Sequence, residues 1–199
     1  MRGCKELPGE YVPVLSIDMQ EDKKLAAWIN GLAAMTMVLL GVLGMIWVPF
    51  DTLIDTEQGS GMLVLRLAAL CVGNVGYIFL HELIHGVFMR WFSGERPHYG
   101  FTSLYAYAGS SAYFNKVSYL IIALAPVVIL GLLLAVLCCV VPRSWFWVVW
   151  FIQMVNLGGA AGDLYVTVKF SVLPPDILIR DEGVRMMVYS ASKGKTGNG

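Results

Sequence analysis

The chain has 199 residues, of which 57% are hydrophobic and 14% are charged. An ordinary soluble domain has roughly 45 to 50% apolar and about 25% charged residues, so this composition excludes a disordered or fibrous chain and indicates contact with lipid. The 14 basic and 14 acidic side chains give a formal net charge of zero. Nucleic-acid binding is not expected, because there is no basic excess to neutralise a phosphate backbone.

Four apolar runs predict transmembrane helices. After a polar segment over residues 1–24, the first run extends from Leu25 to Val48, which is too long for the hydrophobic part of a signal peptide. Each run can cross a hydrocarbon core of about 30 Å at about 1.5 Å per residue. The other three extend from about Gly61 to Phe92, from Val117 to Val141 and from Trp145 to about Phe170. The prediction is an all-α integral membrane fold of about four transmembrane helices, with a membrane domain over residues 25–170 and a tail over residues 171–199.

The basic residues indicate how these helices are oriented. All of the 14 except Arg66 and Arg143 lie in the N-terminal segment, in the connection after the second helix or at the C-terminal end of the chain. The connection over residues 49–60 has no basic residue and carries three acidic ones. By the positive-inside rule both termini face the cytoplasm, which requires an even number of spans. With no targeting segment, the expected location is the plasma membrane.

The connection between the second and third helices has a different character. Residues 97–116 mix aromatic and small residues without helical periodicity, and the Gly-Ser-Ser at 109–111 is a turn signal. A small β-hairpin or a re-entrant loop is expected there.

An HExxH motif, made by His81, Glu82 and His85, lies inside the second predicted span. Residues four apart share one face of a helix, so the two imidazoles can bind one metal ion while Glu82 projects beside them. Hydrolysis with zinc needs two such ligands, a third protein ligand, an open position for water and a carboxylate that takes the proton of that water. The alternative is a polar cluster without a metal. The membrane setting favours the zinc site, since His and Glu in a span must be paired, hydrated or metal-bound.

Asp163 is the expected third ligand. It is the only acidic residue of the last predicted span, about 9 Å inside its cytoplasmic end, and the two histidines lie at a matching depth of about 8 to 13 Å. The small residues at 158–162 allow a close helix approach or local unwinding. The alternative is that Asp163 pairs with another polar group. Three acidic residues of the C-terminal segment, which is expected to be solvated, are reserve candidates: Asp176, Asp181 and Glu182.

Three segments together resemble a known family. His81 to His85, Ala123-Leu124-Ala125-Pro126, and Asn156 with Gly162-Asp163-Leu164 are similar to a family of zincin peptidases that are small membrane proteins. Their metal motif is similar to that of the site-2 proteases, which are intramembrane zinc metalloproteases. The resemblance extends from about residue 70 to 181 and implies His81, His85 and Asp163 as zinc ligands, Glu82 as general base and Asn156 as a substrate-binding residue. In site-2 proteases a proline-containing stretch and an Asp-Gly pair usually follow the Asn, whereas this chain has Leu-Gly-Gly-Ala-Ala-Gly and then Asp163-Leu164.

The expected function is that of a membrane-embedded zinc metalloendopeptidase of the zincin type. It would bind Zn²⁺ and cleave a membrane-protein or peptide substrate in or near the lipid bilayer. The substrate must be locally extended, because a helix hides its carbonyls, and residues 97–113 can offer an edge strand to pair with it.

The alternative is a non-enzymatic metal-binding membrane protein, such as a zinc carrier, a sensor or a pseudoprotease. A carrier needs polar residues along a path through the bilayer, and the first and third predicted spans are almost wholly apolar, which disfavours it. The presence of Glu82 disfavours a pure binding protein, because such a site needs no further carboxylate beside its ligands.

Overall fold

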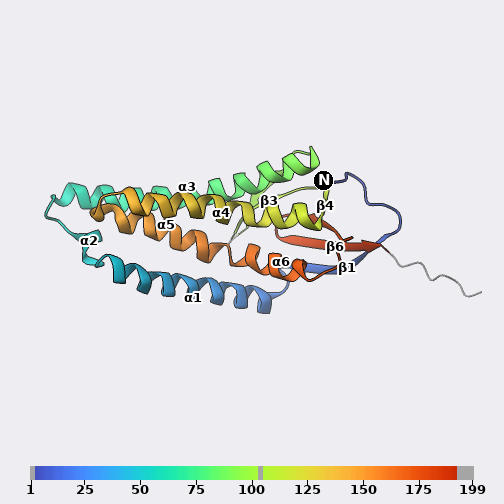
Figure 1. Ribbon diagram of the computed structural model, residues 1–199, viewed down its shortest axis with the longest axis horizontal. Coiled ribbons are helices and arrows are strands. Elements are labelled where there is room, and N and C mark those ends of the chain that lie inside the picture. Colours follow the sequence, from blue (N-terminus) through green and yellow to red (C-terminus); the bar gives the residue numbers. More distant parts are fainter. Residues whose placement is uncertain (1–2, 103–104, 192–199) are drawn as a thin grey trace, which may run out of the picture.

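The computed structural model is elongated, with a helical bundle at one end and a small β-sheet at the other (Figure 1). The structure describes residues 3–102 and 105–191. Its helices are α1 (Lys23–Trp47), α2 (Asp51–Ile54), α3 (Ser60–Ser93), α4 (Lys116–Val140), α5 (Phe146–Gly159) and α6 (Ala161–Ser171), with a 3₁₀ turn over Arg143–Trp145. Its strands are β1 (Tyr11–Asp18), β2 (His98–Phe101), β3 (Ala106–Gly109), β4 (Tyr113–Asn115), β5 (Leu178–Asp181) and β6 (Arg185–Ala191).

Local signals set the ends of the long helices. The Asp22 carboxylate accepts from Leu25 N at 2.9 Å at the start of α1, and the Asn115 side chain accepts from Ser118 N at 2.9 Å at the start of α4. The last turn of α3 closes at Gly94, which has φ +75° and donates its N–H to Arg90 O at 2.8 Å. These caps satisfy backbone groups that a helix end otherwise leaves unpaired.

Three helices in the described part of the chain, α1, α3 and α4, are long and apolar enough to cross a membrane by length and composition. They correspond to the first three predicted spans. The fourth predicted span is not continuous, because the helix breaks at Ala160 (φ −76°, ψ 9°) into α5, with 14 residues, and α6, with 11. The small residues at 158–162 surround this break, so the local unwinding that they allow does occur. The count of four spans stays a prediction.

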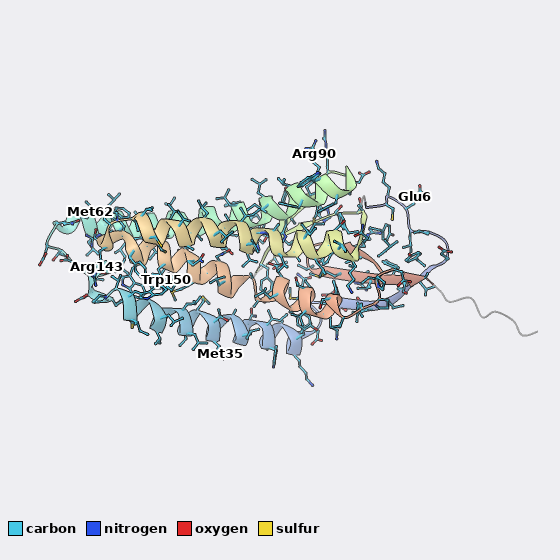
Figure 2. All side chains as sticks on the ribbon, viewed as in Figure 1. Glu6, Met35, Met62, Arg90, Arg143 and Trp150 are labelled. Carbon is cyan, nitrogen blue, oxygen red and sulfur yellow. The ribbon has the colours of Figure 1, made fainter. Side chains whose placement is uncertain are left out.

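Much of the helical surface is apolar. Met35 points outward from α1 and is 54% exposed, whereas Trp150 of α5 lies inside the bundle (Figure 2). A monomeric protein in water rarely exposes a contiguous apolar patch of more than a few hundred Å². The outward faces of these helices therefore suggest membrane association. Large exposed side chains on α1 and α3 include Trp28, Val38, Leu39, Val42, Ile46, Trp47, Val64, Val72, Val75 and Phe79.

The all-α expectation is confirmed only in part, because the structure is mostly helical but its described residues also form two antiparallel sheets. One sheet has the order β1-β6-β5-β4, and β2 pairs with β3 in a separate hairpin. The hairpin confirms the expectation for the connection after the second predicted span. The larger sheet takes β1 from the N-terminal segment and β5 and β6 from the C-terminal segment, so these two polar segments fold together.

One face of the larger sheet is apolar and buried. Val188 of β6 pairs with Leu15 on one side and with Ile179 on the other, and Ile179 pairs in turn with Phe114. Side chains on one face of a strand alternate with those of the other face, so these four residues share a face. They join buried residues of α4 and α6 in one core, which includes Tyr119, Ile122, Val166 and Phe170.

The packing of α1 on α5 generates a stability prediction at Gly44. A Cβ built there would lie 2.8 Å from Trp150 Cδ1 and 2.9 Å from Trp147 Cη2, and both indoles are buried. We expect Gly44→Ala to lower the free energy of unfolding by about 1 to 3 kcal/mol through overpacking. Thermal unfolding in detergent measures the effect. Gly31→Ala on the same helix is the matched control, since nothing lies within 4 Å of its added Cβ and Ala favours a helix by up to about 1 kcal/mol.

Candidate metal centre

Two histidines and one aspartate converge between α3 and α6. His81 and His85 lie one turn apart on α3 and are 7% and 8% exposed, with their Nε2 atoms 3.2 Å apart. Asp163 Oδ2 lies 3.2 Å from His81 Nε2 and 3.5 Å from His85 Nε2. The structure thus brings together the three residues that the sequence predicts as metal ligands, with their ligand atoms within 4.8 Å of one another.

The break at Ala160 determines where Asp163 lies. Leu164 N donates to Ala160 O at 2.9 Å, so a new helix begins directly after α5 and carries Asp163 in its first turn. A carboxylate is favoured at this end of a helix, where the backbone N–H groups carry partial positive charge. Asp163 therefore faces the histidines from a separate short helix.

A proline in α4 orients His85. His85 Nδ1 donates to Ile122 O at 2.9 Å, in the buried interior. In a regular helix that carbonyl would accept from the N–H four residues later, but position 126 is Pro126, which has no N–H. The freed carbonyl takes the Nδ1 proton, and the Nε2 lone pair of His85 then points toward Asp163 and His81.

A hydroxyl orients the other imidazole. Tyr77, one turn before His81 on α3, places its OH 3.0 Å from His81 Nδ1, and the two rings meet edge to face. A hydroxyl can accept the Nδ1 proton, which leaves His81 Nε2 as an acceptor as well. Metal-binding histidines commonly have such a partner on the ring nitrogen that does not bind the metal.

These three acceptor atoms fit a zinc ion. With both histidines in the tautomer described, two imidazole nitrogens and one carboxylate oxygen face one another as acceptors, and a shared cation would satisfy all three. Ligands about 2.0 to 2.1 Å from a tetrahedral zinc ion lie roughly 3.3 Å apart. The three measured separations of 3.2, 3.2 and 3.5 Å agree with that value. An N/N/O donor set is also one that zinc accepts.

The ligand cluster lines a cavity of about 420 Å³ that α1, α3, α4, α6, β3 and β5 surround. Glu82 lies on its wall and is half-buried. The backbone of Ala108 in β3 hydrogen-bonds to the Glu82 carboxylate. The carboxylate of the HExxH motif is therefore held beside the cluster, in a cavity large enough to admit water.

Not every predicted residue lies at this cavity. Asn156 is fully buried between α5 and α4, where its Nδ2 lies 3.4 Å from Val127 O and 3.4 Å from Gln153 Oε1. It is absent from the described residues that line the cavity, and its substrate-binding role stays a prediction. Two reserve candidates also lie elsewhere: the Asp176 carbonyl accepts from Tyr11 OH, and Glu182 pairs with Arg180 at 2.9 Å.

Asp181 corrects the expectation of a solvated C-terminal segment. It is 6% exposed and lines the cavity, although it is not part of the ligand cluster. Its Oδ2 accepts from Tyr119 OH at 2.7 Å, its Oδ1 from Gly183 N at 2.8 Å, and its carbonyl from Ser110 N at 2.7 Å. The residue points inward because it shares the buried face of β5 with Ile179, two positions earlier.

Burial raises the pKa of Asp181 to about 6, although the hydrogen bonds from Tyr119 and Gly183 and the nearby His85 act in the opposite direction. A carboxyl whose pKa is higher in the folded than in the unfolded state binds more protons when folded. Stability then falls as the pH rises from about 4 through about 6.

Sequence reasoning missed the supporting roles of Tyr77 and the Ile122 carbonyl, and it named Asp181 only as a reserve ligand. Tyr77 and the Ile122 carbonyl did have signals, since Tyr77 lies four residues before His81 and Ile122 four residues before Pro126. Asp181 had none, because its inward position depends on a sheet whose strands are far apart in the chain.

Replacement of Tyr77 by Phe tests the support of His81. We expect Tyr77→Phe to weaken zinc binding about tenfold, because loss of an outer partner typically reduces metal affinity 10- to 100-fold. Competition titration with a chromophoric chelator measures the affinity. Tyr165→Phe on α6, outside the cavity, is the control and should bind zinc like the wild type; equal affinities for all three proteins would contradict the role of Tyr77.

Asp181→Asn tests the buried carboxyl. The Asn side chain can accept from Gly183 N and donate to Tyr119 OH, so it keeps the network without a charge. In metal-free protein we expect the variant to be more stable than the wild type above pH 6, by at most about 3 kcal/mol, and the difference to vanish near pH 4. Thermal unfolding in detergent between pH 4 and 8 measures it. A pH-independent difference would show that the carboxyl does not titrate as described.

Comparison with known proteins agrees with this geometry. Residues 74–178, more than half of the chain, match the model of a family described as "Putative zincin peptidase". The matched segment contains the HExxH motif, Pro126 and Asp163. No curated protein and no solved structure matches the chain. The chain belongs to this family of zincin peptidases.

Proposed function

We propose that this protein is a membrane-embedded zinc metallopeptidase that hydrolyses peptide bonds in or near the membrane. The observation that carries the proposal is the convergence of His81, His85 and Asp163, whose acceptor atoms have the spacing of zinc ligands, beside the carboxylate of Glu82. A bound zinc ion supplies a Lewis acid that polarises the scissile carbonyl and makes water acidic enough to lose a proton. Family membership supports the same class of reaction.

Glu82 is the residue that transfers the proton in the proposed hydrolysis. Hydrolysis forms a bond between the carbonyl carbon and a water oxygen and breaks the bond between that carbon and the amide nitrogen. The Glu82 carboxylate accepts the proton of the attacking water and then delivers it to the leaving nitrogen. The hydrogen bond with the Ala108 backbone keeps the carboxylate near the cluster during both transfers.

The edge of β3 that faces the cavity suits an extended substrate, which would pair beside the Ala108 backbone group that already bonds to Glu82. Thr102 N donates to Tyr105 O at 2.7 Å, and in an antiparallel pair the bonded and non-bonded residue pairs alternate. By this alternation the backbone groups of Ala106 and Ala108 point away from β2, and both residues line the cavity. A substrate strand that pairs with this edge would present its backbone to Glu82 and the ligand cluster.

The apolar helices support a site in the membrane. The lipid bilayer would surround α1, α3 and α4, and the cluster would lie toward the side where the sheet and most basic residues gather. The positive-inside rule places that side in the cytoplasm, with both termini, and a plasma membrane is the proposed location.

The test combines metal analysis with hydrolysis. We expect about one zinc per chain in detergent-purified wild type and its loss in His85→Ala and Asp163→Ala, measured by elemental analysis. Glu82→Gln should retain zinc and lose hydrolysis of a denatured protein such as carboxymethylated casein by at least about 100-fold, because it cannot accept a proton.

Two outcomes contradict parts of this proposal. Hydrolysis that persists in Glu82→Gln would remove Glu82 as the base. Zinc that is bound by the ligand set without any hydrolysis would favour the alternative function, a metal-binding membrane protein without enzymatic activity.

A further inference from the structure

A second cavity lies between α3 and the β2–β3 hairpin. It has a volume of about 270 Å³ and is formed by one face of α3 and by both strands of the hairpin. Phe79 and Phe101 meet edge to face at 5.9 Å and are 57% and 66% exposed, so they form an apolar rim. The remaining lining residues are Glu82, Leu83, Tyr99, Gly100, Ala106 and Tyr107.

Glu82 belongs to the walls of both cavities. Ala106 and Tyr107 are also shared, and the ligand cluster lies only in the larger one. The Glu82 carboxylate is the one ionisable carboxyl among the residues lining the second cavity, whose other side chains are apolar or aromatic. A group bound there would therefore be apolar and would lie next to the proposed base.

Two glycines pack against the ring of Tyr107, which belongs to the wall shared by both cavities. A Cβ on Gly100 would lie 2.6 Å from Tyr107 Cζ, and a Cβ on Gly183 would lie 2.7 Å from Tyr107 Cγ, so the ring is confined between two backbones. Gly183 also has φ +99°, a conformation that few other residues adopt. The Tyr107 ring is therefore held in one position in the wall that the two cavities share.

The covalent structure of a peptide determines which substrate side chain can enter the second cavity from the larger one. In the proposed hydrolysis the leaving nitrogen must lie within hydrogen-bond reach of Glu82, because that carboxylate protonates it. The Cα of the residue that supplies this nitrogen is one bond away, whereas the Cα on the carbonyl side is two bonds away. The side chain closest to Glu82 is therefore that of the residue directly after the scissile bond.

We propose that the second cavity binds the side chain of the residue that follows the scissile bond, and that it selects a large apolar one such as Phe or Leu. This inference rests on the proposed function, since it uses Glu82 as the proton donor to the leaving nitrogen. Burial of an apolar side chain between Leu83 and the ring of Tyr107 favours binding, while an acidic side chain would lose its hydration there beside the like-charged carboxylate of Glu82.

The experiment uses fluorescent heptapeptides of Ala and Thr with Phe or Ala at the central position. Binding is measured by anisotropy to the zinc-loaded, full-length Glu82→Gln protein in detergent, so the readout needs no turnover. The Phe peptide should bind about tenfold more tightly than the Ala peptide.

Adding Leu83→Trp, which fills the cavity, should abolish this preference, whereas Leu83→Ala, which enlarges it, should keep it. Leu80→Trp is the matched control, because Leu80 is as exposed as Leu83 on the same helix but does not line the cavity.

Hydrolysis of the same peptides by protein with Glu82 intact separates the two proposals. Equal binding of both peptides, no binding of either, or a preference that Leu83→Trp leaves unchanged would overturn the side-chain cavity even if wild type cleaves peptides. A preference that Leu83→Trp removes, in a protein that cleaves neither peptide, would show an apolar side-chain cavity but overturn both the peptidase and the assignment of the cavity to the residue after the scissile bond.

Discussion

The hydrogen bond from His85 to the Ile122 carbonyl is the interaction on which the candidate metal centre depends most. A backbone carbonyl buried in an apolar helix costs free energy when it is unpaired, and Pro126 leaves this one without its usual partner. The imidazole satisfies the carbonyl, and the carbonyl in turn fixes which nitrogen of His85 faces the cavity. The same contact ties α3 to α4, so packing and ligand orientation share one interaction.

The position of Asp163 depends on the larger sheet and on the helix break at Ala160. Asp163 reaches the histidines from α6, and α6 is held against the inner face of the sheet through Val166 and Phe170. Asp181, on that inner face, accepts a hydrogen bond from Tyr119 and so joins the sheet to α4. The terminal strands thus support the candidate metal centre, although they lie outside the apolar helices.

Most of the candidate site could be predicted from the sequence, because each residue in it is indicated by a local sequence pattern. The HExxH spacing places two imidazoles on one helical face whatever the rest of the fold is, and the matching depth of Asp163 needs only helix geometry. The hairpin also has a local turn signal. The larger sheet has none, since β1 pairs with β6 across most of the chain and both strands lie in polar segments. The inward position of Asp181 depends on such distant packing, so neither the larger sheet nor the place of Asp181 in it was predicted, whereas the small residues at 158–162 did indicate the break after α5.

The pairing of β1 with β6 has a consequence for how the protein is made. A ribosome delivers β1 first and β6 last, and the edge of β1 has no partner among the described strands except β6. The helices can form one after another as they are synthesised, but the sheet closes only when nearly the whole chain has emerged. Until then Asp181 and the wall around it are missing from the cavity. A nascent chain therefore holds an HExxH helix without its complete surroundings, and the order of translation delays assembly of the site until the last strand has paired.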